Sequence, residues 1–300
     1  MNEKIFDDFT AMVQETGAEV FGISYWKDGE TVTKEYDMDG YPKNLYSGTK
    51  TFVSMAIGIC LGRGLIKNLS DPWIRYFPDL EAAPGTEKQR ILELLHMQTG
   101  RDDIENRYAH EGDLLADWAR MPLLWEPGAH FEYCNMSSYT LGRLVERVSG
   151  QSLLDFCREN IFAPVGIRFP QWFADQQGHH FGHSALHLFL DEFAKQGILM
   201  ANEGSWEGRQ IVPKEYMHAM YTDTVSSEEH RGRQPQWHQG YGYQVWMCDR
   251  PGIYRADGFL GQYNIVSANQ RAVVTIQSRV PQPHLCEKII DTAIATVLQE

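Results

Sequence analysis

One apolar run constrains the fold of this chain more than any other stretch. Residues 49–65 (TKTFVSMAIGICLGRGL) are mostly apolar or small, which predicts a helix buried in the core. Ser47 and Lys50 stand at its start, and a helix places side chains three residues apart on one face. The hydroxyl then lies beside an amine and near the positive end of the helix, as an activated serine nucleophile requires. The alternative is a helix-capping serine followed by a solvated lysine.

Composition narrows the class of protein. The 300 residues are 43% apolar and 22% charged, which is typical of a globular protein with one large domain or two that share a core. The 27 basic and 40 acidic side chains give a net charge of −13, which argues against nucleic-acid binding. We expect no membrane span, because no apolar segment is long enough. The acidic N-terminus lacks the apolar core of a signal peptide, so we expect a cytoplasmic protein unless a leader was removed.

The cysteines point to no disulfide framework. They are odd in number and widely scattered, and no two are spaced as C-x-x-C: Cys60, Cys134, Cys157, Cys248 and Cys286. A structural zinc site is therefore not expected, and buried thiols are the simplest interpretation. We expect the protein to use neither a metal nor an organic cofactor.

Strand patterns lie at both ends of the chain, and helical patterns lie between them. Residues 19–26 and 31–36 are separated by the turn sequence KDGE, which predicts an antiparallel hairpin. Short aromatic or β-branched segments return from Tyr241 onward and precede a final amphipathic helix. The expected fold is therefore α+β: an antiparallel sheet flanked by helices, with a largely helical region inserted.

This order also predicts a division of the chain. Residues 1–64 and 180–300 are expected to form a mixed domain with the antiparallel sheet, and residues 65–179 a mainly helical region. The active site is then expected at their interface. Thr86 with Gln89 predicts a capping box before the helical segment ILELLHM.

A second polar pattern is Tyr133-x-Asn135. This spacing places a phenol and an amide on one side of an extended turn. A tyrosine transfers protons when a nearby cation lowers its pKa, and an amide orients both a lysine and a substrate carbonyl. The alternative is a buried tyrosine at a helix entry, with Asn135 as the cap of that helix.

Four ordered motifs together resemble a known superfamily. They are Y-S-G-T-K at residues 46–50, P-G-x-x-F-x-Y-x-N at 127–135, L-G-R-L-V-E-R-V-S-G-x-S at 141–152 and I-F-x-P-V-G-I at 161–167. In this order the set resembles the serine β-lactamase and penicillin-binding-protein superfamily, nearest to its class C β-lactamase, DD-peptidase and esterase branch. The resemblance extends over roughly residues 18–280.

The resemblance implies a role for each polar residue. Ser47 would be the acylated nucleophile and Lys50 its base or proton relay. Tyr133 would carry the proton to the leaving group, and Asn135 would hold both Lys50 and the substrate. A neutral lysine is needed for this chemistry, so Lys50 should be desolvated or near another cation.

The third motif of that superfamily, usually K-T-G or H-x-G on a strand, is altered here. Alignment on Gly258 places Ala256 where a lysine or histidine is expected, which removes a group that would hold a substrate carboxylate. Arg255 is adjacent but should point to the opposite face of the strand. The backbone amides of Phe259 and Ser47 remain available for an oxyanion hole, and Gly258 would let the substrate approach closely.

Three other candidates merit attention. Four histidines cluster in sequence: His179, His180, His183 and His187. His183 and His187 are expected on one helix, at the i, i+4 spacing of metal ligands. A loop-packing or solvated set is the competing interpretation. Ser184 lies in a partial G-x-S-x-G motif, and Cys134 is expected to face away from its two neighbours and to be inert.

We therefore predict a serine hydrolase that forms an acyl-enzyme on Ser47 and acts on a small ester or amide. One alternative is a β-lactamase or D-amino-acid peptidase that recognises the carboxylate by another route. The alternative from a different class of protein is a binding module that becomes acylated once or not at all. Loops 101–120 and 221–240 are expected to shape the substrate pocket.

Overall fold

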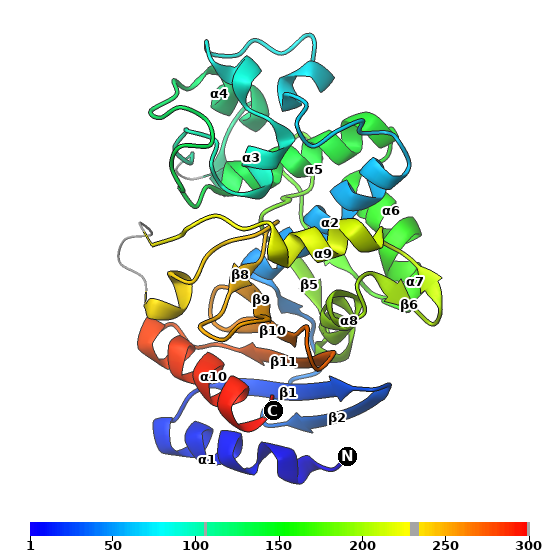
Figure 1. Cartoon of the computed structure of the whole chain (residues 1–300), viewed down its shortest axis with the longest axis vertical. Helices are drawn as coiled ribbons and strands as arrows, with labels where there is room; N and C mark the ends of the chain where they lie inside the picture. Colours follow the sequence, from blue (N-terminus) through cyan, green and yellow to red (C-terminus); the bar gives the residue numbers. More distant parts are fainter. Residues whose placement is uncertain (105–106, 229–233, 299–300) are drawn as a thin grey trace.

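The protein combines helices with antiparallel sheets, as predicted. The computed structural model describes residues 1–104, 107–228 and 234–298. Figure 1 shows α3, α4 and α5 at one end of the molecule and the main sheet toward the other, where α1 and α10 lie. The two sets of elements meet around α2, which begins beside Ser47.

The main sheet has six strands in the order β2-β1-β11-β10-β9-β8, and every neighbouring pair is antiparallel. The predicted first hairpin is confirmed, with Ser24 opposite Thr33. The sheet joins strands from both ends of the chain, because β1 pairs with β11. Its strands are β1 (Val20–Lys27), β2 (Glu30–Glu35), β8 (Trp246–Met247), β9 (Ile253–Gly258), β10 (Gln262–Ser267) and β11 (Ala272–Ser278).

Two smaller sheets complete the strands of the described residues. One has the order β3-β5-β4 and the other pairs β6 with β7. Their bounds are β3 (Lys43–Asn44), β4 (Gln171–Trp172), β5 (Leu186–Leu188), β6 (Ser205–Trp206) and β7 (Arg209–Gln210). Strand β5 corrects the expectation that His183 and His187 share a helix: His187 lies in β5, and the following helix begins only at Leu190.

Most helices lie between the strands of the two chain ends, and α10 follows the last strand, as predicted. The α-helices are α1 (Asp7–Thr16), α2 (Thr49–Gly62), α3 (Ile91–Leu95), α4 (Leu114–Arg120), α5 (Asn135–Ser149), α6 (Leu153–Cys157), α7 (Ala163–Val165), α8 (Leu190–Ala201), α9 (Lys214–Thr222) and α10 (Pro283–Thr296). Short 3-10 turns are η1 (Glu3–Phe6), η2 (Tyr46–Gly48), η3 (Trp73–Tyr76), η4 (Thr86–Lys88), η5 (Arg107–Ala109) and η7 (Pro235–Trp237), and η6 (Arg158–Phe162) is a π-turn.

The capping box predicted at Thr86 is wrong. Thr86 lies in η4, and the cap of α3 is Arg90, whose backbone amide donates to the Glu93 carboxylate. Gln89 is instead buried, and its side chain donates to the carbonyl oxygen of Thr99. The N-cap of α3 lies just after the Thr-x-x-Gln pattern, at an arginine, which is not among the residue types preferred at that position.

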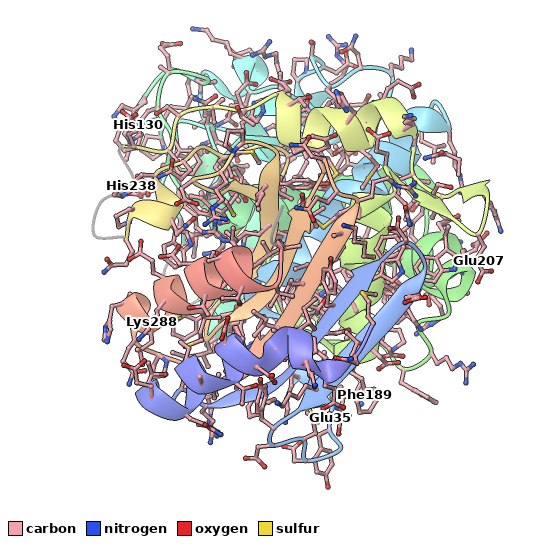
Figure 2. All side chains as sticks on the ribbon, turned by 60° about the horizontal axis from the view of Figure 1, so that its bottom comes forward. Glu35, His130, Phe189, Glu207, His238 and Lys288 are labelled. Carbon is pink, nitrogen blue, oxygen red and sulfur yellow. The ribbon has the colours of Figure 1, made fainter. Side chains whose placement is uncertain are left out.

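Helices cover both faces of the main sheet. Helix α8 packs against β1, β10 and β11 on one face. On the other face, α1 and α10 contact each other, and their apolar side chains share a core with Ile23, Val274 and Ile276. In Figure 2 these two helices lie in front of the sheet, and Lys288 is labelled beside α10. Both faces of the sheet are therefore covered by helices. A site can form only at the ends or edges of its strands.

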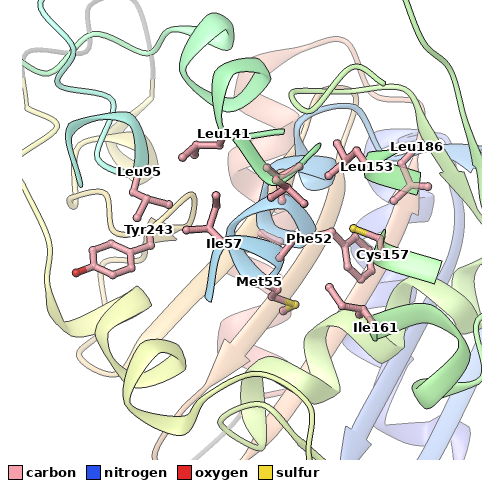
Figure 3. Close-up of a cluster of buried hydrophobic side chains, with 14 of the residues drawn as sticks. Phe52, Met55, Ile57, Leu95, Leu141, Leu153, Cys157, Ile161, Leu186 and Tyr243 are labelled. Carbon is pink, nitrogen blue, oxygen red and sulfur yellow. The ribbon is translucent and has the colours of Figure 1, made fainter. Parts of the chain in front are cut away.

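Helix α2 is buried along almost its whole length. Its side chains contact α5, α9 and β9 and belong to the larger core of the molecule. Figure 3 shows Phe52, Met55 and Ile57 of α2 among side chains from other elements that surround the helix, namely Leu95, Leu141, Leu153, Cys157, Ile161, Leu186 and Tyr243. The prediction of a buried helix is confirmed.

No helix within the described ranges is long and apolar enough to cross a lipid bilayer.

Candidate active site

Ser47 lies in a tight turn at the entry to α2. It is the middle residue of η2, and Thr49 begins the α-helix directly after it. The preceding residue, Tyr46, has a φ of 46°, a left-handed conformation that costs a non-glycine residue on the order of 1–3 kcal/mol. The Asn44 side chain accepts a hydrogen bond from the Tyr46 amide at 2.8 Å and so supports this turn. The turn leaves the Ser47 hydroxyl partly exposed, while Lys50 is buried.

Lys50 contacts three oxygens. Its Nζ lies 2.9 Å from Ser47 Oγ, 2.8 Å from Asn135 Oδ1 and 2.8 Å from the carbonyl oxygen of His183. The expected neighbours Ser47 and Asn135 are thus both within hydrogen-bond distance of one amine. The third contact, to a backbone carbonyl, was not foreseen from the sequence.

The environment of Lys50 favours the neutral amine. Its side chain is 1% exposed, and this burial lowers its pKa from 10.5 to about 7. The charge of Asp103 opposes this shift, and the charge of Arg107 adds to it. A substantial fraction of Lys50 is therefore unprotonated near neutral pH, which is the form that accepts a proton.

Asn135 is the first residue of α5, and Asp103 fixes its amide. Asn135 Nδ2 donates to Asp103 Oδ2 at 2.8 Å, so its Oδ1 is turned toward Lys50. Asp103 is held in turn by the backbone amide of Met136 at 3.2 Å and by Arg107 at 3.2 Å. The ion pair of Asp103 and Arg107 therefore lies behind Asn135 and holds its amide in position.

Tyr133 lies on the open side of Lys50, whose Nζ is 5.1 Å from the centre of the phenol ring. The ring stacks on Trp246 with 5.4 Å between centroids and meets the edge of Tyr241. These contacts orient the tyrosine through apolar surface, next to the cation or amine it is expected to work with.

Gly258 ends β9 beside the nucleophile, and Phe259 follows it. A Cβ at Gly258 would lie 2.1 Å from the carbonyl oxygen of Leu45, so only glycine fits where this strand passes the turn before Ser47. Close approach by the protein's own backbone is enough to require this glycine. The Phe259 side chain is exposed and meets the ring of Tyr46 edge-on at 5.6 Å.

A cavity of about 90 Å³ opens beside Ser47. It runs past Tyr133 and the end of β9 toward the start of α10, and its walls are largely aromatic or apolar. Its lining residues are Ser47, Tyr133, Trp237, Trp246, Asp257, Gly258, Phe259, Leu260, Tyr263, Val280, Pro281, Pro283 and Cys286. Trp237 lies in the loop 221–240 that was expected to shape the pocket, and residues 229–233 of that loop and 105–106 of the other lie outside the described residues.

In the third motif, the residue that lines the cavity is Asp257 and not Ala256, the position to which the motif alignment pointed. Ala256 is fully buried in the larger core, whereas Asp257 lines the cavity. Arg255 shares the face of Asp257, and its Nε donates to Asp257 Oδ2 at 2.9 Å. Arg255 is itself fully buried and is not among the described residues that line the cavity.

The histidines do not converge on one point. His179 Nδ1 contacts Glu146 Oε2 at 2.6 Å, and His180 and His187 contact the carbonyl oxygens of Trp172 and Ala185. His183 is fully buried, and burial lowers the pKa of its ring well below the usual range, with the charges of Lys50 and Arg107 acting in the same direction. Across residues 1–104, 107–228 and 234–298, no three His, Cys, Asp or Glu side chains are grouped to hold a metal ion.

Ser184 and Cys134 are both buried away from this cavity. The carbonyl oxygen of Ser184 accepts from the Trp172 indole at 3.1 Å. Cys134 faces Asp102 and Asp103, and burial raises the pKa of its thiol. A thiol held in its protonated form is a poor nucleophile, which agrees with the inert role expected for Cys134.

The fold and this arrangement of side chains agree with the family that the whole sequence identifies. The sequence profile of the family described as Beta-lactamase matches residues 9–299, nearly the whole chain, and the chain belongs to that family.

Individual relatives agree with this assignment. A D-aminopeptidase from Brucella ovis is 36% identical over 102 residues, which are 30% of this chain and 20% of that protein, so the match spans well under two thirds of that relative. An octameric penicillin-binding protein homologue from Pyrococcus abyssi has a TM-score of 0.75 at 20% identity, covering 98% of this chain and 77% of that one. EstCE1, a hydrolase with promiscuous acyltransferase activity, has a TM-score of 0.76 at 15% identity over 96% and 98% of the two chains. At these identities the two structures support the fold alone.

Proposed function

We propose that this protein hydrolyses small esters or amides through an acyl-enzyme on Ser47. The observation that carries the proposal is the contact of one buried amine, Lys50 Nζ, with both Ser47 Oγ and Asn135 Oδ1. A scaffold without chemistry has no physical need for a desolvated lysine whose amine is directed at a partly exposed hydroxyl.

Counting donors and acceptors gives the direction of proton transfer. A neutral amine has two N–H groups and one lone pair. Asn135 Oδ1, turned by Asp103, and the His183 carbonyl oxygen can only accept, so they take the two N–H groups. The lone pair is left for Ser47, whose hydroxyl then donates to Lys50. The neutral form is thus arranged as a general base.

In the proposed reaction, Ser47 Oγ attacks the substrate carbonyl carbon while its proton passes to Lys50 Nζ. The carbonyl oxygen becomes an oxyanion, stabilised by the backbone amides of Ser47 and Phe259. The bond to the leaving alcohol or amine then breaks, and Tyr133 delivers the proton from Lys50 to it. Water then attacks the carbonyl carbon of the resulting ester and gives a proton to Lys50 Nζ. The bond from that carbon to Ser47 Oγ breaks as Lys50 passes the proton on to Oγ, which releases the free acid and restores Ser47.

A second candidate is a D-amino-acid peptidase. The D-aminopeptidase relatives favour it, although the matched region is less than a third of this chain for the Brucella ovis protein. A β-lactamase that holds a substrate carboxylate is less favoured, because the buried Ala256 supplies no cation at the position where the third motif would have one.

The test is hydrolysis of p-nitrophenyl acetate and butyrate by the native protein and by Ser47→Ala. We expect many turnovers from the native protein and only the uncatalysed rate from the variant. Ser54→Ala is the matched control, since Ser54 lies in α2 but its Oγ contacts the Tyr216 hydroxyl instead of the site. Mass spectrometry of the quenched reaction should show the acyl group on the Ser47 peptide.

Two results would overturn the proposal. Equal rates for the native protein and Ser47→Ala would mean that another nucleophile is at work. A single burst of p-nitrophenol, one per molecule with no further turnover, would support the single-turnover binding module instead.

A further inference from the structure

We propose that three buried polar side chains outside the cavity, Gln196, Asn264 and Thr275, position the nucleophile Ser47. They form one chain of hydrogen bonds that ends on η2, the turn that carries Ser47. None of the three lines the cavity, so they are positioning residues and not catalytic ones. This inference rests on the proposed hydrolase function and adds to it a part of the core that controls the reaction rate.

Each link of the chain is short and buried. Thr275 Oγ1, on β11, donates to Asn264 Oδ1 at 2.6 Å. Asn264 Nδ2, on β10, donates to Gln196 Oε1 at 3.1 Å. Gln196 Nε2, on α8, donates in turn to the carbonyl oxygen of Gly48 at 3.0 Å. The three side chains are at most 1% exposed, so the chain links the main sheet, through α8, to the turn before α2.

Only one arrangement of donors and acceptors fits the chain. The Gly48 carbonyl oxygen can only accept, so the Gln196 amide presents its NH2 group there and its Oε1 to Asn264. Asn264 presents its own NH2 group to that Oε1 and to the carbonyl oxygen of Phe193, at 2.9 Å. Its Oδ1 is then directed at Thr275. Neither amide can turn over without placing acceptor against acceptor, so each link fixes the next.

The chain holds the turn on one side of the nucleophile, and another amide holds the other side. Gln196 binds the carbonyl oxygen of Gly48, the residue after Ser47. Asn44 Oδ1 accepts from the backbone amide of Tyr46, the residue before it. The left-handed φ of Tyr46 persists only where surrounding contacts enforce it. Fixing the backbone on both sides directs the Ser47 hydroxyl and amide, the two groups that the proposed reaction uses.

Helix α8 lies close enough to the sheet for this chain because residue 197 is a glycine. A Cβ at Gly197 would lie 2.5 Å from Val273 Cγ1 and 2.9 Å from Asn264 Oδ1. A larger residue would push α8 away from β10 and β11. The helix also supports the turn directly, since a Cβ at Gly48 would lie 3.4 Å from the ring of Phe193. The spacing of α8 and the sheet therefore sets the position of the turn.

The first measurement is kcat/KM for p-nitrophenyl acetate, per folded molecule, in Gln196→Met and Thr275→Val. Both substitutions remove a hydrogen-bonding group with little change of shape. We expect a fall of about 10- to 100-fold for Gln196→Met and about 3- to 10-fold for Thr275→Val. Thr275→Ser keeps the hydroxyl and should stay near the native value.

Thr51→Val is the matched control. Thr51 lies in α2 and is fully buried, but its hydroxyl donates to the carbonyl oxygen of Gln244 at 2.9 Å and is not part of the chain. Its kcat/KM per folded molecule should be native. An equal fall in Thr51→Val and Thr275→Val, or no fall in folded Gln196→Met when the native protein hydrolyses the ester, would overturn the proposal.

A double mutant distinguishes a linked chain from independent contacts. Gln196→Met cuts the chain next to the turn, so adding Thr275→Val should lower kcat/KM by no more than about twofold further. No group in the chain is charged, so kcat/KM should still rise with pH through the lowered pKa of Lys50, about 7. Effects of the two substitutions that multiply, or a rise shifted toward the ordinary lysine pKa, would contradict positioning through the chain.

Hydrogen exchange of the turn needs no substrate. Amide exchange in residues 46–49 should be faster in folded Gln196→Met and Thr275→Val than in the native protein and Thr51→Val. This result in a protein that hydrolyses no ester would support the positioning chain and remove the hydrolase function. Unchanged exchange in both folded variants would overturn the positioning chain. If Gln196→Met does not fold, the comparison of Thr275→Val with Thr275→Ser decides.

Discussion

At the scale of single residues, the protonation state of Lys50 controls the proposed chemistry. The lysine must be neutral to take the proton of Ser47, and burial lowers its pKa to about 7. We therefore predict that kcat/KM for p-nitrophenyl acetate rises with pH through about 7 and then levels off. The sign follows because the charged, inactive form is lost as pH rises through the lowered pKa. An ascending limb centred near the ordinary lysine pKa would contradict this prediction, and Lys50→Arg, always charged, should be inactive.

Asp103 gives a second residue-scale prediction. It accepts a hydrogen bond from Asn135 and so turns the amide oxygen toward Lys50. Asp103→Ala should lower kcat by about 10- to 100-fold, since misplaced catalytic groups cost that much. Asp102→Ala is the control, because the Asp102 side chain is exposed.

The pH profile distinguishes positioning from general damage in that experiment. The charge of Asp103 raises the pKa of Lys50, so its removal should move the ascending limb to lower pH. A slower enzyme with an unmoved limb would mean that Asp103 acts only on local structure.

Site residues could be predicted when their contacts are close in sequence or when a motif marks them. Ser47 and Lys50 lie one turn apart, so helical spacing alone brings them together. Asn135 was found through a motif, and its contact with Lys50 spans 85 positions. The His183 carbonyl and Asp103 were missed, since a backbone oxygen leaves no mark in residue identity and Asp103 acts through Asn135. Asp257 was missed because alignment on Gly258 directed attention to its neighbour Ala256.

At the scale of elements, α2 shows how tightly the nucleophile's helix is packed. A Cβ at Gly58 would lie 2.5 Å from the ring of Tyr216 in α9. We predict that Gly58→Ala lowers the free energy of unfolding by about 1–3 kcal/mol, measured in urea, although alanine is the better helix former by about 1 kcal/mol.

A double-mutant cycle checks the cause. In a Tyr216→Ala background the ring is gone, so Gly58→Ala should become neutral or stabilising. A stabilising effect of Gly58→Ala in the native background would show that the ring moves aside at little cost and that helix propensity dominates.

Elements with a strong local pattern were predictable, and those that depend on distant pairing were not. The hairpin β1–β2 and the helix α2 follow from alternation and from a long apolar run. Strand β5 has three residues and forms only because β3 and β4, from other parts of the chain, lie on either side of it. Its sequence LHL alternates, but three residues are too few to indicate a strand, and this is why a helix was predicted there.

At the scale of the whole molecule, α1 and α10 close the sheet on the face away from α8. Phe9 of α1 is fully buried in the core that they share with the sheet. We predict that Phe9→Ala costs about 3–5 kcal/mol of stability, by urea or thermal unfolding. Asp8→Ala, on the exposed side of the same helix, should leave stability nearly unchanged.

The loss of stability in Phe9→Ala should not lower its activity, as long as the assay is run below the unfolding transition. Phe9 is not among the residues that line the cavity, so kcat/KM per folded molecule is expected to remain at the native value. A fall in kcat/KM would show that this core transmits strain to the site. The division into residues 1–64 with 180–300 and residues 65–179 stays a prediction, for which separate unfolding transitions would be the sign.

The burial of α2 has a practical consequence. The helix that carries Lys50 and follows Ser47 is surrounded by core side chains, so it cannot fray while the rest of the protein stays intact (Figure 3). If Ser47 is acylated as proposed, an ester whose fluorescent acyl group is removed only slowly from Ser47 would label only intact molecules. The label would then count correctly folded copies of the purified protein across a set of variants, with no antibody.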